Sequence, residues 1–196
     1  LGLLLTQFLS IINDNLLKWL VAELAIHHMG DSYRGFALGV GTAAFVLPFI
    51  LFASPAGYLA DRFRKRDVIV YVKAIELVVA LLATLAIGLS STPLMFITLF
   101  LLGTQASLFG PAKLGSIPEI LKPERLSIAN GIANLTTVVA IIIGTIAGFE
   151  LYDLTQPSGL EPVAIPGIGK VNGLLVSGAI MLGLAILGLL SSLLIR

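Results

Sequence analysis

The stretch LGLLLTQFLSIINDNLLKWLVAELAI, residues 1–26, decides the class of fold. It is long enough to cross a bilayer, which takes about 20 predominantly apolar residues, yet it carries Asp14 and Lys18 near its centre. An ionised side chain there costs roughly 2.5 to 3.5 kcal/mol, so it faces a cavity or a partner. The polar residues recur at helical spacing and form one stripe: Gln7, Ser10, Asp14 and Lys18. We expect this stripe to face a pathway through the protein.

The composition of the whole chain is that of an integral membrane protein. Hydrophobic residues make up 57% and charged residues 12%, whereas about 25% of a soluble domain is charged. The net charge of +1 is too small to form a basic face, so no nucleic-acid partner is expected. The absence of cysteine excludes disulfides, thiolate nucleophiles and Cys-ligated metals.

Apolar runs separated by breakers predict an all-α integral membrane fold with six transmembrane helices, which form one lobe built from two three-helix repeats. The predicted spans are about 1–26, 36–60, 68–90, 93–121, 126–152 and 172–195. The long connection before the last span is rich in Pro and Gly and is expected to be irregular. Residues 1–196 contain no second domain in this interpretation, and the chain is expected to be a fragment trimmed at both ends.

The distribution of basic residues predicts the orientation, because cytoplasmic loops are enriched in them. One side of the predicted bundle carries eight: Arg62, Arg64, Lys65, Arg66, Lys73, Lys122, Arg125 and Arg196. The opposite side carries only Arg34 and Lys170. Both chain ends are therefore expected to be cytoplasmic.

The fourth span repeats the anomaly of the first. Lys113 lies about 13 Å of helix from Lys122, close to the expected midplane. Gly110 and Pro111 weaken the helix just before it, as in the broken helices near transporter binding sites. The alternative is a proline kink with a lysine that reaches the headgroups by snorkelling.

Spans one and four begin the two predicted triplets, so an inverted repeat would bring their charges to one cavity. Asp14, Lys18 and Lys113 sum to +1, which leaves one ammonium for an anion and favours a phosphorylated or carboxylated substrate. A purely structural pair of Asp14 with Lys18 is the alternative. The further candidate substrate-binding residues are Gln7, Gln105, Asn130 and Asn134, of which the two asparagines could instead bond between helices.

Small residues at four-residue spacing predict close helix packing: Gly35, Gly39 and Ala43 in the second span, and Ala140, Gly144 and Gly148 in the fifth. His27 and His28 have no carboxylate or cysteine at ligand spacing, so no metal site is expected. No arrangement typical of nucleophilic catalysis or phosphate cradling occurs. We expect neither an enzyme nor a cofactor.

The segment GYLADRFRKR, residues 57–66, carries a resemblance to a known family. It resembles the cytoplasmic signature of the major facilitator superfamily, in which a glycine is followed four residues later by an acid and then by basic residues. Arg64 stands where a glycine is usual. The resemblance implies a cytoplasmic latch that breaks as two lobes move, with Gly57, Asp61, Arg62 and Arg66 as gating residues. The alternative is an anchor of the positive-inside kind.

Further segments resemble the lysophospholipid transporter family: QFL (7–9) with NDN (13–15), FGPAKLG (109–115) with PE (118–119), ANG (129–131) and IGT (143–145). The resemblance implies a bacterial inner-membrane carrier that moves lysophospholipid inward, sometimes fused to acyltransferase and acyl-carrier-protein ligase domains. Asp14 and Lys113 match the charged positions of that family. Some members carry a carboxylate where this chain has Asn134.

Three functions are therefore compared. The favoured one is a lysophospholipid transport lobe that works by alternating access with a C-terminal six-helix lobe, absent from this chain, and with membrane lipids around it. The second is a non-transporting membrane module that presents lysolipid to a fused acyltransferase. The third is a proton-coupled efflux carrier for amphipathic drugs, in which Asp14 is the titrating group.

Overall fold

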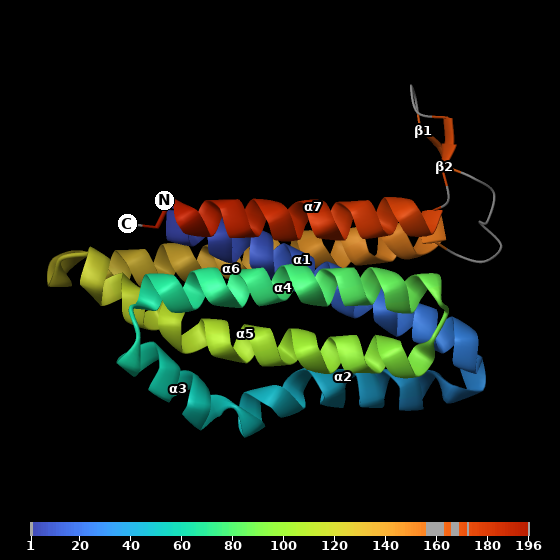
Figure 1. Cartoon of the computed structure of the whole chain (residues 1–196), viewed down its shortest axis with the longest axis horizontal. Helices are drawn as coiled ribbons and strands as arrows, with labels where there is room; N and C mark the ends of the chain where they lie inside the picture. Colours follow the sequence, from blue (N-terminus) through green and yellow to red (C-terminus); the bar gives the residue numbers. More distant parts are fainter. Residues whose placement is uncertain (1, 156–162, 166–168, 172, 196) are drawn as a thin grey trace.

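The computed structural model describes residues 2–155, 163–165, 169–171 and 173–195. Long helices lie side by side in a bundle (Figure 1): α1 (Gly2–Met29), α2 (Arg34–Leu51), α3 (Ala53–Arg62), α4 (Lys65–Gly88), α5 (Thr92–Ile120), α6 (Leu126–Thr155) and α7 (Gly173–Leu193). Short 3-10 turns, η1 (Asp31–Tyr33) and η2 (Pro123–Arg125), precede α2 and α6. The prediction of an all-α membrane fold is confirmed.

The second predicted span is divided into two helices. α2 ends at Leu51, and α3 begins at Ala53 and turns away from the axis of α2 (Figure 1). Pro55 explains the break, because it has no N–H to donate to the carbonyl of Leu51 and its ring crowds that carbonyl. The prediction of one helix over residues 36–60 is therefore wrong, because the helix is interrupted at Phe52.

Five stretches are long and apolar enough to cross a membrane: Asp31–Leu51, Lys65–Gly88, Thr92–Ile120, Pro123–Asp153 and Val176–Leu193. α1 is also long, at 28 residues, but it is not among the five because polar side chains between Gln7 and Lys18 interrupt its apolar sequence. Its polar residues are nevertheless buried by the helices around it.

The connection between α6 and α7 is not wholly irregular. It contains two short strands, β1 (Val163–Ile165) and β2 (Gly169–Val171), paired antiparallel with Val163 opposite Val171. The remaining residues of this connection lie outside the described part of the chain.

The contacts between helices follow an approximate internal symmetry. α1 packs mainly against α6 and α7, whereas α5 packs mainly against α2 and α4. If α1, α2 and α4 are matched with α5, α6 and α7, the α1–α6 contact corresponds to the α5–α2 contact, and α1–α7 corresponds to α5–α4. The contact of α4 with α7 then corresponds to itself. This exchange is the pattern expected of two three-helix repeats.

Glycines permit the closest helix contacts. A Cβ on Gly144 would lie 2.5 Å from the carbonyl oxygen of Ile12, and one on Gly148 would lie 2.9 Å from that of Leu16. In the equivalent contact, a Cβ on Gly103 of α5 would lie 2.1 Å from the carbonyl oxygen of Phe45 in α2. The predicted packing role of the small residues in α6 is confirmed.

The corresponding prediction for α2 is wrong within this chain. Gly35 and Gly39 have no neighbouring atom within 4 Å of a Cβ position, and Ala43 is exposed. The buried face of α2 instead carries Ala37 and Gly41, and Gly41 faces side chains of α5. Periodicity alone did not identify which of these interleaved small residues face the neighbouring helix.

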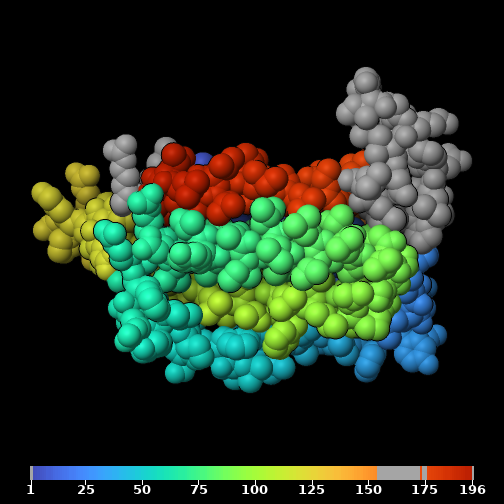
Figure 2. Space-filling view, in the orientation of Figure 1, coloured from blue at the N-terminus to red at the C-terminus, as the bar shows by residue number. Residues whose placement is uncertain are grey.

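The loops that carry most of the basic residues meet at one end of the bundle. The start of α1, the α3–α4 junction, η2 and the end of α7 lie there, and the α1–α2 and α4–α5 connections lie at the other end (Figure 1). Arg196 lies outside the described residues. Between the two ends, α4 is uncovered along its length (Figure 2), with large apolar side chains such as Tyr71, Val78 and Leu85 exposed.

Candidate functional site

The polar stripe of α1 is buried in the centre of the bundle, but its side chains reach different neighbours. Gln7 contacts α6, Ser10 contacts α4, and Asp14 contacts α5. All three are at least nine-tenths buried, whereas Lys18 is half-buried. The stripe therefore faces protein on three sides and does not line one open channel within this chain.

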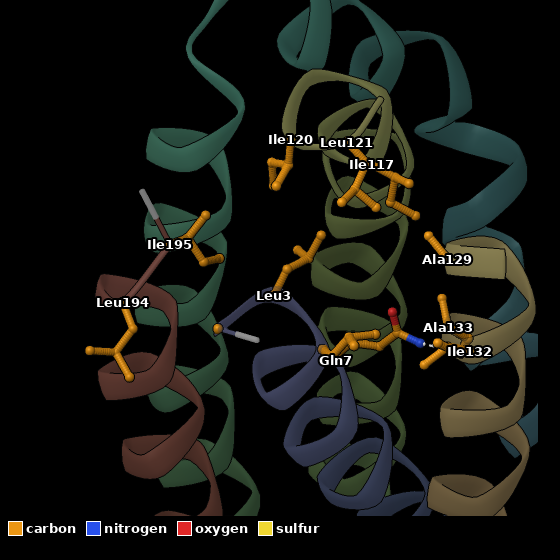
Figure 3. A pocket seen from close by; sticks show the side chains of 12 residues that line it. Leu3, Gln7, Ile117, Ile120, Leu121, Ala129, Ile132, Ala133, Leu194 and Ile195 are labelled. Atoms are coloured by element: carbon orange, nitrogen blue, oxygen red, sulfur yellow. Dashed lines mark hydrogen bonds between the residues drawn. The ribbon is translucent and has the colours of Figure 1, made fainter. Parts of the chain in front are cut away.

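Gln7 connects α1 to α6 and lies at the inner end of a pocket. Its Nε2 donates hydrogen bonds to the carbonyl of Ala133 at 2.8 Å and to Oγ1 of Thr137 at 2.6 Å. The pocket has a volume of about 420 Å³ (Figure 3). Its other walls are apolar and come from the starts of α1 and α6 and from the ends of α5 and α7, with Leu3, Ile117, Ile120, Leu121, Ile132 and Leu194 among them.

Asp14 and Gln105 are brought together, as the sequence analysis grouped them. Nε2 of Gln105 donates to Oδ1 of Asp14 at 3.1 Å, and both side chains are buried. The hydrogen bond joins α1 to α5, the first helices of the two repeats. Asp14 thus has a polar partner within the bundle, and that partner is an amide and not an ammonium.

Lys18 does not form the predicted pair with Asp14. No ion pair within 4.0 Å joins these two described residues. The Nζ of Lys18 instead donates to Oδ1 of Asn15 at 3.3 Å, and it lies 5.5 Å from the ring centre of Trp19 and 5.7 Å from that of Phe45. Lys18 also lines a pocket of about 230 Å³ between α1, α2 and α5. The alternative of a structural Asp14–Lys18 pair is therefore not seen as a direct ion pair in the described residues.

A buried ion pair that the sequence analysis missed lies between α1 and α4. Nζ of Lys73 donates to Oε2 of Glu76 and to Oγ of Ser10, and these two charged side chains are 0% and 1% exposed. Ser10 donates to Oε2 of Glu76 at 3.0 Å, and Nδ2 of Asn13 donates to Oε1 at 3.3 Å. Lys73 was placed just inside the third span and counted with the basic residues of one side of the bundle, whereas the structure buries it completely among the helices.

The signal was present in the sequence. Lys73 and Glu76 are three residues apart in an otherwise apolar span, a spacing at which helix side chains meet. Counting basic residues by their distance from a loop placed Lys73 with its neighbours, because Arg66 and Lys65 begin the same helix. Lys73 lies about two helical turns after the start of α4, and this position argued against grouping it with Lys65 and Arg66.

Lys113 is connected to this cluster through an aromatic ring. The Nζ of Lys73 lies 4.4 Å from the ring centre of Phe109, and the Nζ of Lys113 lies 5.9 Å from the same centre. Lys113 is half-buried. Gly110 and Pro111 do not interrupt α5, which is continuous from Thr92 to Ile120, so the predicted break before Lys113 is not observed.

Asn130 and Asn134 are both exposed on α6. They lie on the outer face of that helix, among exposed apolar residues such as Ile128 and Leu135. Within this chain the structure therefore does not bring either amide to Asp14 or Lys113.

The predicted gating residues lie at the end of the bundle where α3 meets α4. Gly57 has no close neighbour, and Asp61 forms no ion pair within 4.0 Å among the described residues. Arg62 lies 5.8 Å from the ring centre of Tyr58, in its own helix. Arg66 reaches further, since its Nη2 donates to the carbonyl of Leu193 in α7 at 3.4 Å.

One ion pair at this end was not predicted. Nζ of Lys65 and Oε1 of Glu119 form an ion pair at 2.5 Å, which joins the start of α4 to the end of α5. Arg66 and Lys65 together therefore connect the two repeats at one end of the bundle. The sequence signal for this ion pair was the opposite charge of Lys65 and Glu119, which lie near the ends of two predicted spans.

The described part of the chain contains no group of three or more His, Cys, Asp and Glu side chains that could hold a metal ion. His27 and His28 are exposed at the end of α1, with ring centres 5.9 Å apart. Nδ1 of His28 lies 2.7 Å from the carbonyl oxygen of Leu24.

The helical membrane fold agrees with comparisons to known proteins. The chain belongs to the Major Facilitator Superfamily, whose family profile matches residues 3–196. Membership of this superfamily points to a membrane transporter and not to an enzyme.

Particular relatives are also similar. The chain is 32% identical over 170 residues to a protein of Escherichia fergusonii named lysophospholipid transporter LplT, covering 87% of this chain and 41% of the relative. It is 33% identical over 171 residues to the protein of that name from Salmonella arizonae, with the same coverage. The chain thus spans about two fifths of the length of these relatives. No solved structure matches the chain.

Proposed function

We propose that this chain is the N-terminal six-helix lobe of a carrier that moves lysophospholipid across the bacterial inner membrane. The observation that carries the proposal is the half-buried Lys113 on α5, next to a buried cluster of charges, in a chain that is similar to proteins named lysophospholipid transporters. A second, C-terminal six-helix lobe completes the transport pathway, and membrane lipids surround both lobes.

The headgroup site uses the two half-buried lysines. Lys113 and Lys18 lie on α5 and α1, and neither forms an ion pair within 4.0 Å among the described residues. An ammonium is a compact, strongly hydrated cation that binds phosphate as a point charge. The phosphodiester of a lysophospholipid binds at Lys113, and Lys18, which lies beyond the Asp14–Gln105 contact along the bundle axis, contacts another part of the substrate. Asp14 and Gln105 hold together the helices that carry the two lysines.

The acyl chain requires apolar surface beside the headgroup site. The pocket between α1, α5, α6 and α7 is apolar except at Gln7, and it begins one helical turn beyond Lys113, at Ile117. Each methylene that leaves water contributes about 0.8 kcal/mol. Asn130 and Asn134, exposed on α6, face the second lobe and contact the substrate only in the complete carrier.

Alternating access requires contacts that break as the lobes rock against each other. The basic end of the bundle is cytoplasmic in this proposal, as are both chain ends, because cytoplasmic loops are enriched in Lys and Arg. Gly57, Asp61, Arg62 and Arg66 form the gate there, supported by the ion pair of Lys65 with Glu119.

Two further partners belong to the proposal. Inward movement of a lysophospholipid supplies an acyl acceptor, so acyltransferase and acyl-carrier-protein ligase domains are expected to act on the cargo, whether fused or separate.

The competing function, efflux of amphipathic cationic drugs with Asp14 as a proton carrier, is disfavoured because the half-buried charges closest to the pockets are lysines.

The test uses the full-length protein in proteoliposomes. Uptake of labelled lysophosphatidylethanolamine is compared with that of a monoacylglycerol of the same chain length, which has no phosphate. We expect uptake of the first and little of the second. Equal uptake of both, or export of cationic drugs without lysophospholipid uptake, contradicts the proposal.

A further inference from the structure

The buried cluster where α1, α4 and α5 meet contains more carboxyl groups than ammonium groups. Its buried ionisable groups are Asp14, Glu76 and Lys73, two carboxyl groups and one ammonium. The ammonium contacts only one of these carboxylates, that of Glu76. Asp14 therefore has no cation in contact.

The two nearby lysines, Lys18 and Lys113, do not contact Asp14 either. Lys18 is half-buried, and its ammonium lies against Asn15 and between two aromatic rings. Lys113 is also half-buried, and its ammonium lies beside Phe109, on a residue about two helical turns along α5 from Gln105. With both carboxyl groups ionised, the buried set has one negative charge in excess, a state that is costly without a counter-ion.

Two amide oxygens in the same cluster have no hydrogen-bond donor. Oδ1 of Asn13 and Oε1 of Gln105 are buried and unpaired. Each belongs to an amide whose nitrogen donates to a carboxylate, Asn13 to Glu76 and Gln105 to Asp14. Because oxygen and nitrogen share one carbon, each unpaired oxygen lies in the neighbourhood of the carboxyl group that its own amide contacts, that of Glu76 for Asn13 and that of Asp14 for Gln105. Rotating either amide would place its oxygen against a carboxylate oxygen, so rotation offers no remedy.

We propose that Asp14, Asn13 and Gln105 bind a monovalent metal cation, with sodium as the fitting ion. All the free ligand atoms are oxygens, which hard cations prefer. One positive charge balances the enclosed set, whereas a divalent ion would leave it positive. A proton on Asp14 would also balance the charge, but its single O–H could satisfy only one of the two unpaired oxygens. The ion joins α1 to α5, and so it joins the two repeats.

Sodium binding is tested on the purified full-length protein without any lysophospholipid. The thermal unfolding midpoint is measured as sodium chloride replaces choline chloride at constant ionic strength, because a ligand of the folded state raises stability with its concentration. We expect a saturable rise of several degrees. The Asp14→Asn and Gln105→Leu variants should lose the rise, and Asn15→Ala, which removes a neighbouring amide with its own partners, should keep it.

The wild-type titration alone decides the question if a variant fails to fold. A response to potassium as well as sodium supports a monovalent-cation site without size selection. Absence of a saturable response to either ion overturns the proposal, as does an equal response in Asp14→Asn. A midpoint that shifts with pH in choline and not with sodium assigns the site to a proton and also overturns it. Because no lysophospholipid is present, failure of the proposed transport function leaves this result unaffected.

Discussion

The buried pair of Lys73 and Glu76 gives the sharpest prediction about stability. Lys73→Met keeps the length of the side chain but leaves the Glu76 carboxylate enclosed without its cation. Removing one partner of a buried ion pair costs about 3 to 5 kcal/mol. Glu76 keeps two hydrogen bonds, from Ser10 and Asn13, so we expect the lower end, about 3 kcal/mol. That is a large fraction of the 5–15 kcal/mol typical of a folded protein.

The double variant separates the ion pair from simple packing. Lys73→Met with Glu76→Leu removes both charges, and such replacements are often neutral or stabilising, so the double variant should recover most of the loss. Lys65→Met is the matched control on the same helix, because its partner Glu119 is 58% exposed and such pairs contribute about 0–1 kcal/mol.

Equilibrium unfolding of the full-length protein in mixed micelles measures all four proteins. The reasoning is refuted if Lys73→Met costs no more than Lys65→Met. It is also refuted if the double variant is as unstable as the single one, since the loss would then come from packing against Phe109 and not from an unpaired charge.

The remaining predictions concern Asp14, orientation and helix packing. Asp14→Asn should reduce both gradient-driven uptake and exchange of preloaded lysophospholipid, because both need α1 and α5 held in place by the Asp14–Gln105 contact; loss of uptake alone would indicate proton coupling, and loss of neither would show that transport does not need the Asp14 carboxylate. Cysteines introduced at Arg64 and Ser32 of this cysteine-free chain should react with an impermeant maleimide from opposite sides of the membrane, and labelling from one side would contradict the assigned ends. Gly144→Ala places a Cβ 2.5 Å from a carbonyl of α1 and should destabilise the lobe by about 1–3 kcal/mol, whereas Gly183→Ala, with no neighbour within 4 Å, should be close to neutral in the same unfolding assay.

The class of fold was predictable because a charge in an apolar span is rare and therefore informative. Asp14 and Lys113 pointed to α1 and α5, and the breakers gave the helix ends to within a few residues. The division at Phe52 was missed because Pro55 was treated as part of one helix, although its effect on the carbonyl of Leu51 was available from the sequence.

The partner of each polar side chain could not be predicted in the same way. Periodicity shows which residues share a face, but it does not show which helix packs there. Ser10 and Asp14 share a stripe and yet contact α4 and α5. The position of Lys18 could not be predicted either, because its ammonium lies near two aromatic rings and one of them, Phe45, belongs to α2.

The central claim is that a lysine within the helical lobe binds the phosphate of a lysophospholipid. The most direct measurement is uptake of labelled lysophosphatidylethanolamine by proteoliposomes that contain equal amounts of wild-type or Lys113→Ala full-length protein. We expect Lys113→Ala to abolish uptake at near-normal protein levels, and Lys113→Arg to restore little of it, because a planar guanidinium does not replace a compact ammonium. Equal uptake by Lys113→Ala and the wild type would contradict the account.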